Sequence, residues 1–183
     1  MDFQQAYKAI LEELSGALAK VEPERVAKLV EAIEGAKRVF VVGAGRSGLM
    51  VRTFAMRLMQ MGLEAHVVGE TTTPSMRPGD VLVAVSGSGE TASTVLFAEN
   101  AKKAQGRVAA VLADRHTKLG GIADILMVIP GRARTGVGMD SMQMPGSLFE
   151  QAAFMFFDAA VTTLVQKRGE SYPGMSKRHT NLQ

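Results

Sequence analysis

Five short strand candidates, the most apolar of them at residues 81–85, alternate along the chain with longer segments that have a helical pattern. The strand candidates are residues 38–42, 64–69, 81–85, 107–113 and 125–130. Continuous apolar runs bounded by glycine are typical of strands that are buried on both faces of a sheet. Strands that alternate with helices form a parallel sheet with helices on both sides. The sequence therefore predicts a three-layer α/β/α fold with a five-stranded parallel sheet, and five strands favour the flavodoxin-like order 2-1-3-4-5.

Two helices are expected before the first strand. Apolar residues recur at helical spacing over residues 3–18, and again over residues 26–33 after Pro23, which can begin a helix. Each helix has a single apolar stripe, which must pack against the domain or against another subunit. We therefore expect residues 1–36 to form a helical extension and residues 37–183 to form the main domain.

The composition argues against several classes of function. Among 183 residues, 21 Lys and Arg stand against 18 Asp and Glu, and no cluster of five or more basic residues occurs, so no nucleic-acid partner is predicted. The absence of cysteine excludes thiolate metal sites, and the three histidines match no metal spacing, so no metal is expected. No apolar run reaches about 18 residues and the N-terminus does not read as a signal peptide. A soluble, cytoplasmic protein without a membrane partner is the expectation.

Two loops rich in glycine and serine follow the first and third predicted strands, as GAGRSG at residues 43–48 and SGSGET at residues 86–91. In the expected strand order these loops flank the point where ligands bind to such sheets. The second loop offers three hydroxyls and precedes a helix whose free N–H groups point back at it. A turn between a strand and a helix would look similar, but the density of hydroxyls favours an anion site, most often for phosphate.

The first loop also fits the G-x-G-x-x-G pattern of dinucleotide folds, and Glu70 stands near the usual ribose-binding offset. Three observations count against a dinucleotide: the chain leaves little room for a second substrate domain, Ser47 stands inside the turn, and the second loop has no role in that scheme. The dinucleotide interpretation is therefore disfavoured. The hydroxyls of residues 71–75 could bind a polyol or could equally hold their own loop.

Glu150 is the candidate general base. The segment SLFE at residues 147–150 matches a capping box with Ser147 as N-cap and Glu150 at N3. A carboxylate in a partly buried cleft can also move a proton between adjacent carbons, so both roles are open. Glu90 lies within the phosphate loop and Asp140 in a methionine-rich loop, so neither is as well placed.

His179 is a second catalytic candidate. It lies in a polar tail, residues 169–183, that has no helix or strand pattern. An unligated, mobile histidine is the usual case for such a position. A tail that contains Lys-Arg-His could also fold over a phosphate site, most readily that of a neighbouring subunit.

Six segments together resemble the sugar isomerase (SIS) domain and, within it, the 6-phospho-3-hexuloisomerase subfamily. SGSGET alone indicates only the SIS superfamily, whereas GETTTPS combined with the RH-x-NL tail is much narrower. The segments are VGAGRSG at 42–48, FAMRLMQMG at 54–62, VGETTTPS at 68–75, VSGSGET at 85–91, SLFEQ at 147–151 and KRHTNL at 177–182.

The resemblance implies isomerisation of 3-hexulose 6-phosphate to fructose 6-phosphate through an enediol, in formaldehyde fixation by the ribulose monophosphate pathway. It also implies a cofactor-independent enzyme and a homotetramer. Glu150 falls on the family's proposed proton acceptor. The substrate-binding positions that it implies are Ser47, Ser86, Gly87, Ser88, Gly89, Glu90 and Thr91.

Other functions stay open at this point. SIS domains also serve as sugar-phosphate sensors in transcription regulators, but only about 37 residues precede the first strand here and they lack a basic recognition helix. A different aldose–ketose isomerase of the same superfamily, acting on an arabinose or heptose phosphate, is another alternative. The nicotinamide-dependent enzyme discussed above is the third.

Overall fold

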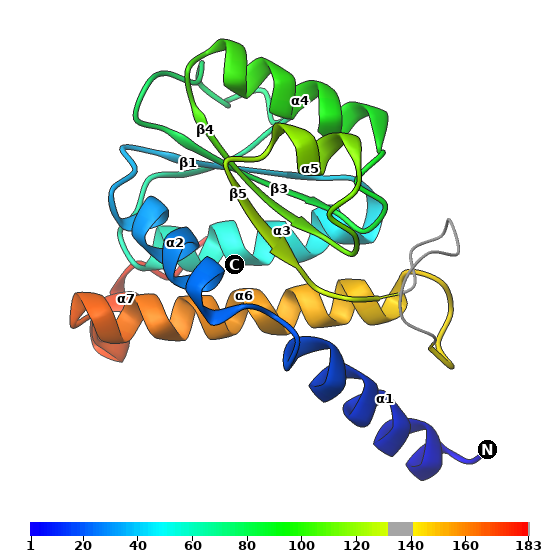
Figure 1. Ribbon diagram of the computed structural model, residues 1–183. Helices are drawn as coiled ribbons and strands as arrows, with labels where there is room; N and C mark the ends of the chain where they lie inside the picture. Colours follow the sequence, from blue (N-terminus) through cyan, green and yellow to red (C-terminus); the bar gives the residue numbers. More distant parts are fainter. Residues whose placement is uncertain (132–140, 183) are drawn as a thin grey trace.

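The computed structural model describes residues 1–131 and 141–182, and a five-stranded parallel sheet forms its centre (Figure 1). The strands follow the order β2-β1-β3-β4-β5, and every pairing is parallel. The predicted fold class and strand order are therefore confirmed. The strands are β1 Val39–Gly43, β2 Ala65–Val67, β3 Val81–Ser86, β4 Arg107–Leu112 and β5 Ile125–Val128.

Helices cover both faces of the sheet. One face carries α4 and α5, and the other carries α3 with α6 packed beneath it and α2 at the side of β5 (Figure 1). The two N-terminal helices expected from the sequence are present. The helices are α1 Phe3–Leu18, α2 Pro23–Glu34, α3 Gly45–Gln60, α4 Ala92–Lys103, α5 Lys118–Ile122, α6 Ser147–Arg168 and α7 Tyr172–Lys177.

The inner strands β1, β3 and β4 are mostly apolar because each of their two faces meets a separate core. In β1, Val39 and Val41 join the cluster that includes Phe54 of α3 and Phe157 of α6, while Phe40 joins the cluster beneath α4. Side chains alternate between the faces of a strand, so a strand covered on both sides has few polar positions. This is the physical origin of the apolar runs in the sequence.

Helix α6 is long and apolar enough to cross a membrane by length and composition. The core helix of a globular domain passes the same test. Nine of its residues are buried, and Phe157 stacks on Phe54 of α3 with ring centroids 4.5 Å apart. Its apolar character is thus accounted for by packing inside the domain.

The C-terminal tail is more ordered than the sequence indicates. Residues 169–183 were expected to lack a helix, but α7 forms between residues 172 and 177. The side chain of Ser171 accepts a hydrogen bond from Gly174 N, and a proline occupies the first turn. The expectation was wrong because a six-residue helix is too short to display an apolar stripe.

Candidate functional site

A cleft of about 770 Å³ opens where the carboxyl ends of β1 and β3 meet the first turns of α3 and α6. The two strands are in register up to the pair Gly43 and Val85, so the loops that follow them emerge side by side. The volume is within the usual range for small-molecule sites. The cleft is lined by Ala44, Gly45, Arg46, Ser47, Val85, Ser86, Gly87, Ser88, Thr91, Met144, Pro145, Gly146, Ser147, Phe149 and Glu150.

The first loop brings the start of α3 against the end of β1. A Cβ atom on Gly48 would lie 2.5 Å from the carbonyl oxygen of Gly43, and one on Gly43 would lie 2.9 Å from Gly48 N. Only glycine at both positions permits this approach. The close contact leaves Ser47 buried at the wall of the cleft and Arg46 more exposed at its rim.

The second loop gathers three hydroxyls around Ser86. Its Oγ lies 3.1 Å from Thr91 Oγ1 and 3.5 Å from Ser88 Oγ, and it accepts a hydrogen bond from Gly89 N at 3.1 Å. Thr91 is the N-cap of α4 but its side chain makes no capping bond, so its hydroxyl belongs to this cluster. Hydroxyls next to a helix N-terminus form a preorganised site for an anion.

Gly89 and Glu90 do not line the cleft, although both belong to the SGSGET segment. The carboxylate of Glu90 accepts a hydrogen bond from Lys118 N at 2.8 Å and pairs with Lys118 Nζ at 3.2 Å. Gly89 has a positive φ of 64°, and a Cβ there would lie 2.2 Å from Thr117 Oγ1. These two residues shape the loop and fasten it to α5.

The residues around 71–75 are likewise outside the cleft. Thr73 Oγ1 donates a hydrogen bond to the carbonyl oxygen of Val67 at 2.6 Å. Of the two interpretations that the sequence left open, this contact favours a loop that is held by its own hydroxyls.

The expected capping box at the start of α6 is wrong. Gly146, with a φ of 93°, is the N-cap and Ser147 is already helical; no side chain makes a capping bond there. The amide of Glu150 donates instead to the carbonyl oxygen of Gly146 at 3.0 Å. A glycine in the left-handed region can turn the chain into the helix one residue earlier. The carboxylate of Glu150 is therefore not occupied by capping.

The carboxylate of Glu150 faces the cleft and pairs with Arg46 of α3. Arg46 Nε lies 2.5 Å from Glu150 Oε2, and the Glu150 side chain is 17% exposed against 57% for Arg46. Burial raises the pKa of Glu150, and the charge and hydrogen bond of Arg46 offset this only in part, so its pKa lies above the ordinary value. A raised carboxylate pKa is typical of a group that exchanges protons with a substrate.

Arg46 is the site residue that sequence reasoning missed. It stands inside the GAGRSG segment, which predicted the loop but gave no sign of a role for this side chain.

Asp140, which the sequence offered as an alternative base to Glu150, lies outside the described residues. Among the described residues, no group of three or more His, Asp or Glu side chains is arranged to hold a metal ion.

The side chain of Arg46 controls the proton affinity of Glu150, which gives a pH prediction. Arg46→Gln removes the charge that lowers the pKa of Glu150, so that pKa should rise further. A base is lost as pH falls through its pKa, so the acid limb of kcat/KM should move to higher pH. Arg52→Gln is the matched control, because Arg52 pairs with Glu70 outside the cleft. Superimposable profiles for the two variants would contradict the pairing.

The structure does not bring His179 into the cleft of its own chain. Its neighbour Arg178 donates to the carbonyl oxygen of Gln60, the last residue of α3, at 2.9 Å. Arg46 and Ser47 are at the opposite end of that helix, whose 16 residues span about 22 Å. The exposed ring of His179 lies 3.2 Å from the carbonyl oxygen of Thr180.

The sheet order, the two glycine loops and the hydroxyl cluster define a parallel α/β domain with a preorganised anion site at the carboxyl ends of β1 and β3. The chain belongs to the SIS domain family, whose model matches residues 32–155. The 3-hexulose-6-phosphate isomerase of Mycobacterium gastri is 43% identical over 183 residues, covering 100% of this chain and 92% of that protein. The enzyme of the same name from Bacillus subtilis is 40% identical, covering 95% of each chain.

A solved structure points in the same direction. A hypothetical protein from Methanococcus jannaschii, whose crystal structure was said to infer a 3-hexulose-6-phosphate isomerase function, superposes with a TM-score of 0.86 at 29% identity. The match covers 98% of this chain and 99% of that one. The likeness therefore extends over the N-terminal helices and the tail as well as the central domain.

Proposed function

We propose that the chain is a cofactor-independent isomerase that converts 3-hexulose 6-phosphate to fructose 6-phosphate, a reaction of the ribulose monophosphate pathway of formaldehyde fixation. One observation carries the proposal: the carboxylate of Glu150 shares a cleft with the hydroxyl cluster around Ser86. Relatives with the name of this enzyme match the chain from end to end. A phosphorylated sugar as substrate also favours a cytoplasmic location.

The reaction moves a carbonyl from C3 to C2. Glu150 removes the proton from C2, O3 takes up a proton, and an enediol shared by C2 and C3 results. Loss of the O2 proton and return of a proton to C3 from Glu150 then give fructose 6-phosphate. One carboxylate can perform both transfers, because the two carbons are adjacent. Arg46 is placed to stabilise the negative charge at this end of the cleft.

The phosphate of the substrate fixes the distance to Glu150. Ser86, Ser88 and Thr91 present hydroxyls next to the N-terminus of α4, and Ser47 faces them from α3. When the phosphate dianion is bound at the N-terminus of α4, C2 and C3 of the sugar are held at a fixed position relative to the base. We propose that these four hydroxyls bind the phosphate.

The decisive experiment is a coupled assay of the purified protein with 3-hexulose 6-phosphate, which detects fructose 6-phosphate as product. Arabinose 5-phosphate and sedoheptulose 7-phosphate serve as alternative substrates. Turnover of the hexulose phosphate alone supports the proposal. Turnover of another sugar phosphate, or binding of fructose 6-phosphate without turnover, would favour a different SIS isomerase or a sensor.

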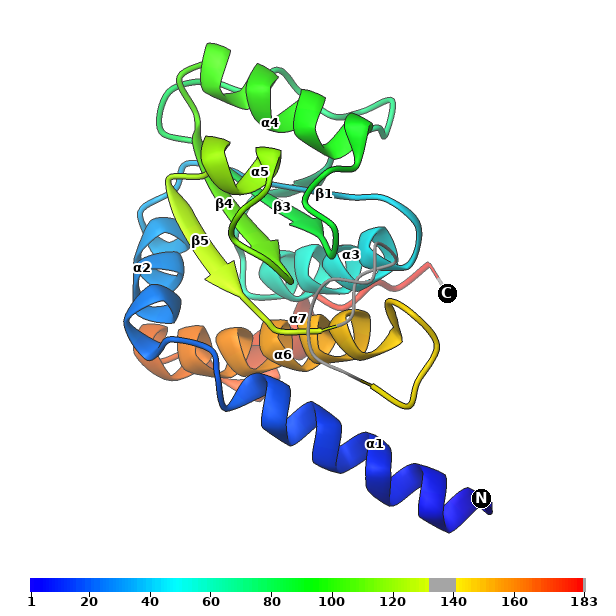
Figure 2. The same cartoon turned by 45° about the vertical axis from the view of Figure 1, so that its right-hand side comes forward.

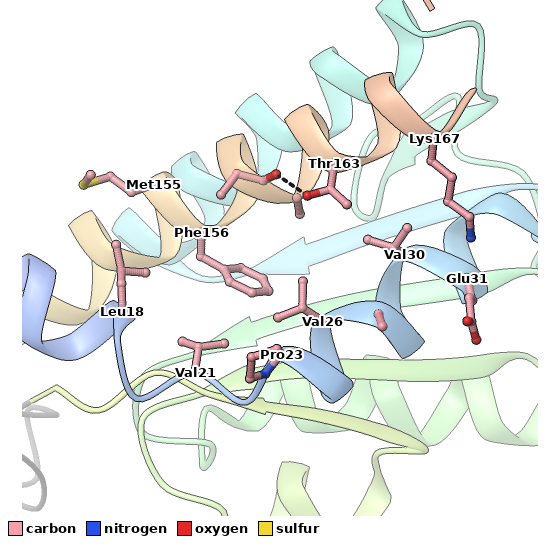
Figure 3. A pocket seen from close by; sticks show the side chains of 13 residues that line it. Leu18, Val21, Pro23, Val26, Val30, Glu31, Met155, Phe156, Thr163 and Lys167 are labelled. Carbon is pink, nitrogen blue, oxygen red and sulfur yellow. Dashed lines mark hydrogen bonds between the residues drawn. The ribbon is translucent and has the colours of Figure 1, made fainter. Parts of the chain in front are cut away.

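We further propose that the enzyme is a homotetramer. An apolar groove of about 630 Å³ runs between α2 and α6, and Val26, Val30 and Phe156 point into it (Figure 3). Helix α1 extends away from the rest of the molecule (Figures 1 and 2), with Phe3 and Tyr7 exposed. A monomer in water would leave these apolar surfaces uncovered. Sedimentation at micromolar concentration should therefore give about four times the 19.5 kDa mass of one chain, and a species with the mass of one chain would refute the proposal.

We propose that His179 acts in the cleft of a neighbouring subunit, where it hydrogen-bonds a sugar oxygen. His179→Ala should then lower turnover, and so should Glu150→Gln. When the two variants are co-expressed, some sites receive Glu150 from one chain and His179 from the other. Recovered activity in the purified mixed oligomer is the expected result, whereas activity no higher than that of the two variants alone would contradict a shared site.

A further inference from the structure

Glu13 of α1 holds the segment that leads into the cleft. Its carboxylate accepts hydrogen bonds from Ser141 Oγ at 2.7 Å, from Met142 N at 2.8 Å and from Gln143 Nε2 at 2.9 Å. Ser141 Oγ in turn accepts from Gln143 N at 3.0 Å. One side chain of the N-terminal helix thus fixes three consecutive residues that are far away in the sequence.

The chain continues directly from these residues to the wall of the cleft. Met144, Pro145 and Gly146 line the cavity. The carbonyl oxygen of Met144 accepts from Ser147 N, and that of Gly146 accepts from Glu150 N, both at 3.0 Å. Only six residues therefore separate the last residue held by Glu13, Gln143, from the candidate base, Glu150. Movement of the held segment would be transmitted to the first turn of α6.

The Glu13 carboxylate is suited to such a role by its charge and its surroundings. Burial raises its pKa, but the bonds from Gln143, Met142 and Ser141 together outweigh burial and leave the pKa below the ordinary value. The group is thus ionised at neutral pH, and bonds to a charged acceptor are stronger than bonds between neutral groups. Its helix is fixed to the domain by Leu14 and Ala17, which belong to the main core.

We propose that Glu13 is a positioning residue for the active site. It holds residues 141–143, and through them the Met144–Gly146 wall and the first turn of α6, in the arrangement that places Glu150 beside the bound sugar. Glu13 lies outside residues 32–155, the part of the chain matched by the SIS model. The N-terminal extension then has a part in turnover as well as in packing. This inference depends on the proposed function for its catalytic consequence.

The test compares Glu13→Ala and Glu13→Gln with Glu12→Ala. Glu12 is the matched control, since it is exposed on the same helix and has no hydrogen bond or ion pair to any described residue. Glu13→Ala should lower kcat about tenfold and change KM by less than about twofold, because the phosphate loop lies on other elements. The kcat of Glu13→Gln should lie between those of Glu13→Ala and the wild type. Its amide keeps one acceptor oxygen but directs N–H groups at neighbouring donors.

Amide hydrogen exchange of the peptide that covers residues 141–149 is the second readout. It should be faster in Glu13→Ala than in Glu12→Ala, while the sheet peptides exchange alike. Equal exchange in the two variants would overturn the proposal, and so would faster exchange with kcat unchanged. A fall in kcat that follows a general loss of thermal stability would overturn it too. Wild-type protein without isomerase activity would refute the proposed function alone, and exchange would still decide whether Glu13 holds the segment.

Discussion

Glu150→Gln is expected to fold normally, to bind fructose 6-phosphate and to lose at least ~10²-fold in turnover, the lower range for general acid–base catalysis. The amide keeps the shape of the carboxylate and can still hydrogen-bond, but it cannot accept a proton from carbon. Glu150 lines the cleft and its pKa is raised by burial, so the substitution removes a group that is poised to exchange protons.

The structure makes this variant easier to interpret. Since Gly146 rather than Ser147 is the N-cap of α6, neither Glu150→Gln nor Ser147→Ala removes a capping bond, and both should leave thermal stability nearly unchanged. Glu99→Gln is the matched control, because Glu99 is exposed on α4, does not line the cleft and should retain near-normal turnover.

Exchange of the C3 proton of fructose 6-phosphate with solvent deuterium gives an independent measurement. The enediol route permits this exchange in the wild-type enzyme, and Glu150→Gln should abolish it. A Gln variant that keeps more than about a tenth of wild-type turnover would contradict the assignment of Glu150 as base.

Ser86→Ala is expected to weaken binding of the sugar phosphate by roughly 10- to 150-fold, the equivalent of about 1.5–3 kcal/mol for a hydrogen bond to a charged group. Ser86 is 3% exposed, and its Oγ is the one that contacts Thr91, Ser88 and Gly89 N. Removal of the Ser86 hydroxyl takes away a hydrogen-bond donor to the phosphate and also the contacts that hold Thr91, Ser88 and Gly89 N around it. Isothermal titration with fructose 6-phosphate measures the change.

Ser93→Ala is the control for this variant, because Ser93 is an exposed residue in the first turn of α4 that does not line the cleft. It should bind fructose 6-phosphate with wild-type affinity. Equal affinity in both variants would mean that the phosphate does not reach Ser86, and a crystal soaked with fructose 6-phosphate would then show the phosphate elsewhere.

The sequence by itself determined the sheet and the two loops rich in glycine and serine. Apolar runs such as residues 81–85 arise because the strand is buried on both faces. Burial on both faces can therefore be predicted from the composition of a single strand. The glycines at positions 43 and 48 and the hydroxyls at 86–91 likewise act through local geometry. Local patterns of this kind can be read without knowledge of the rest of the chain.

Tertiary structure alone decided how the side chains of the site are paired. Arg46 meets Glu150, and Glu13 meets Ser141, across long stretches of sequence, and no periodicity predicts which two distant charged or polar groups will touch. The N-cap moved from Ser147 to Gly146 because the entry into α6 depends on a left-handed turn rather than on a side-chain acceptor. The chain composition fixed which groups were available, and packing of α1, α3 and α6 around the sheet fixed where they met.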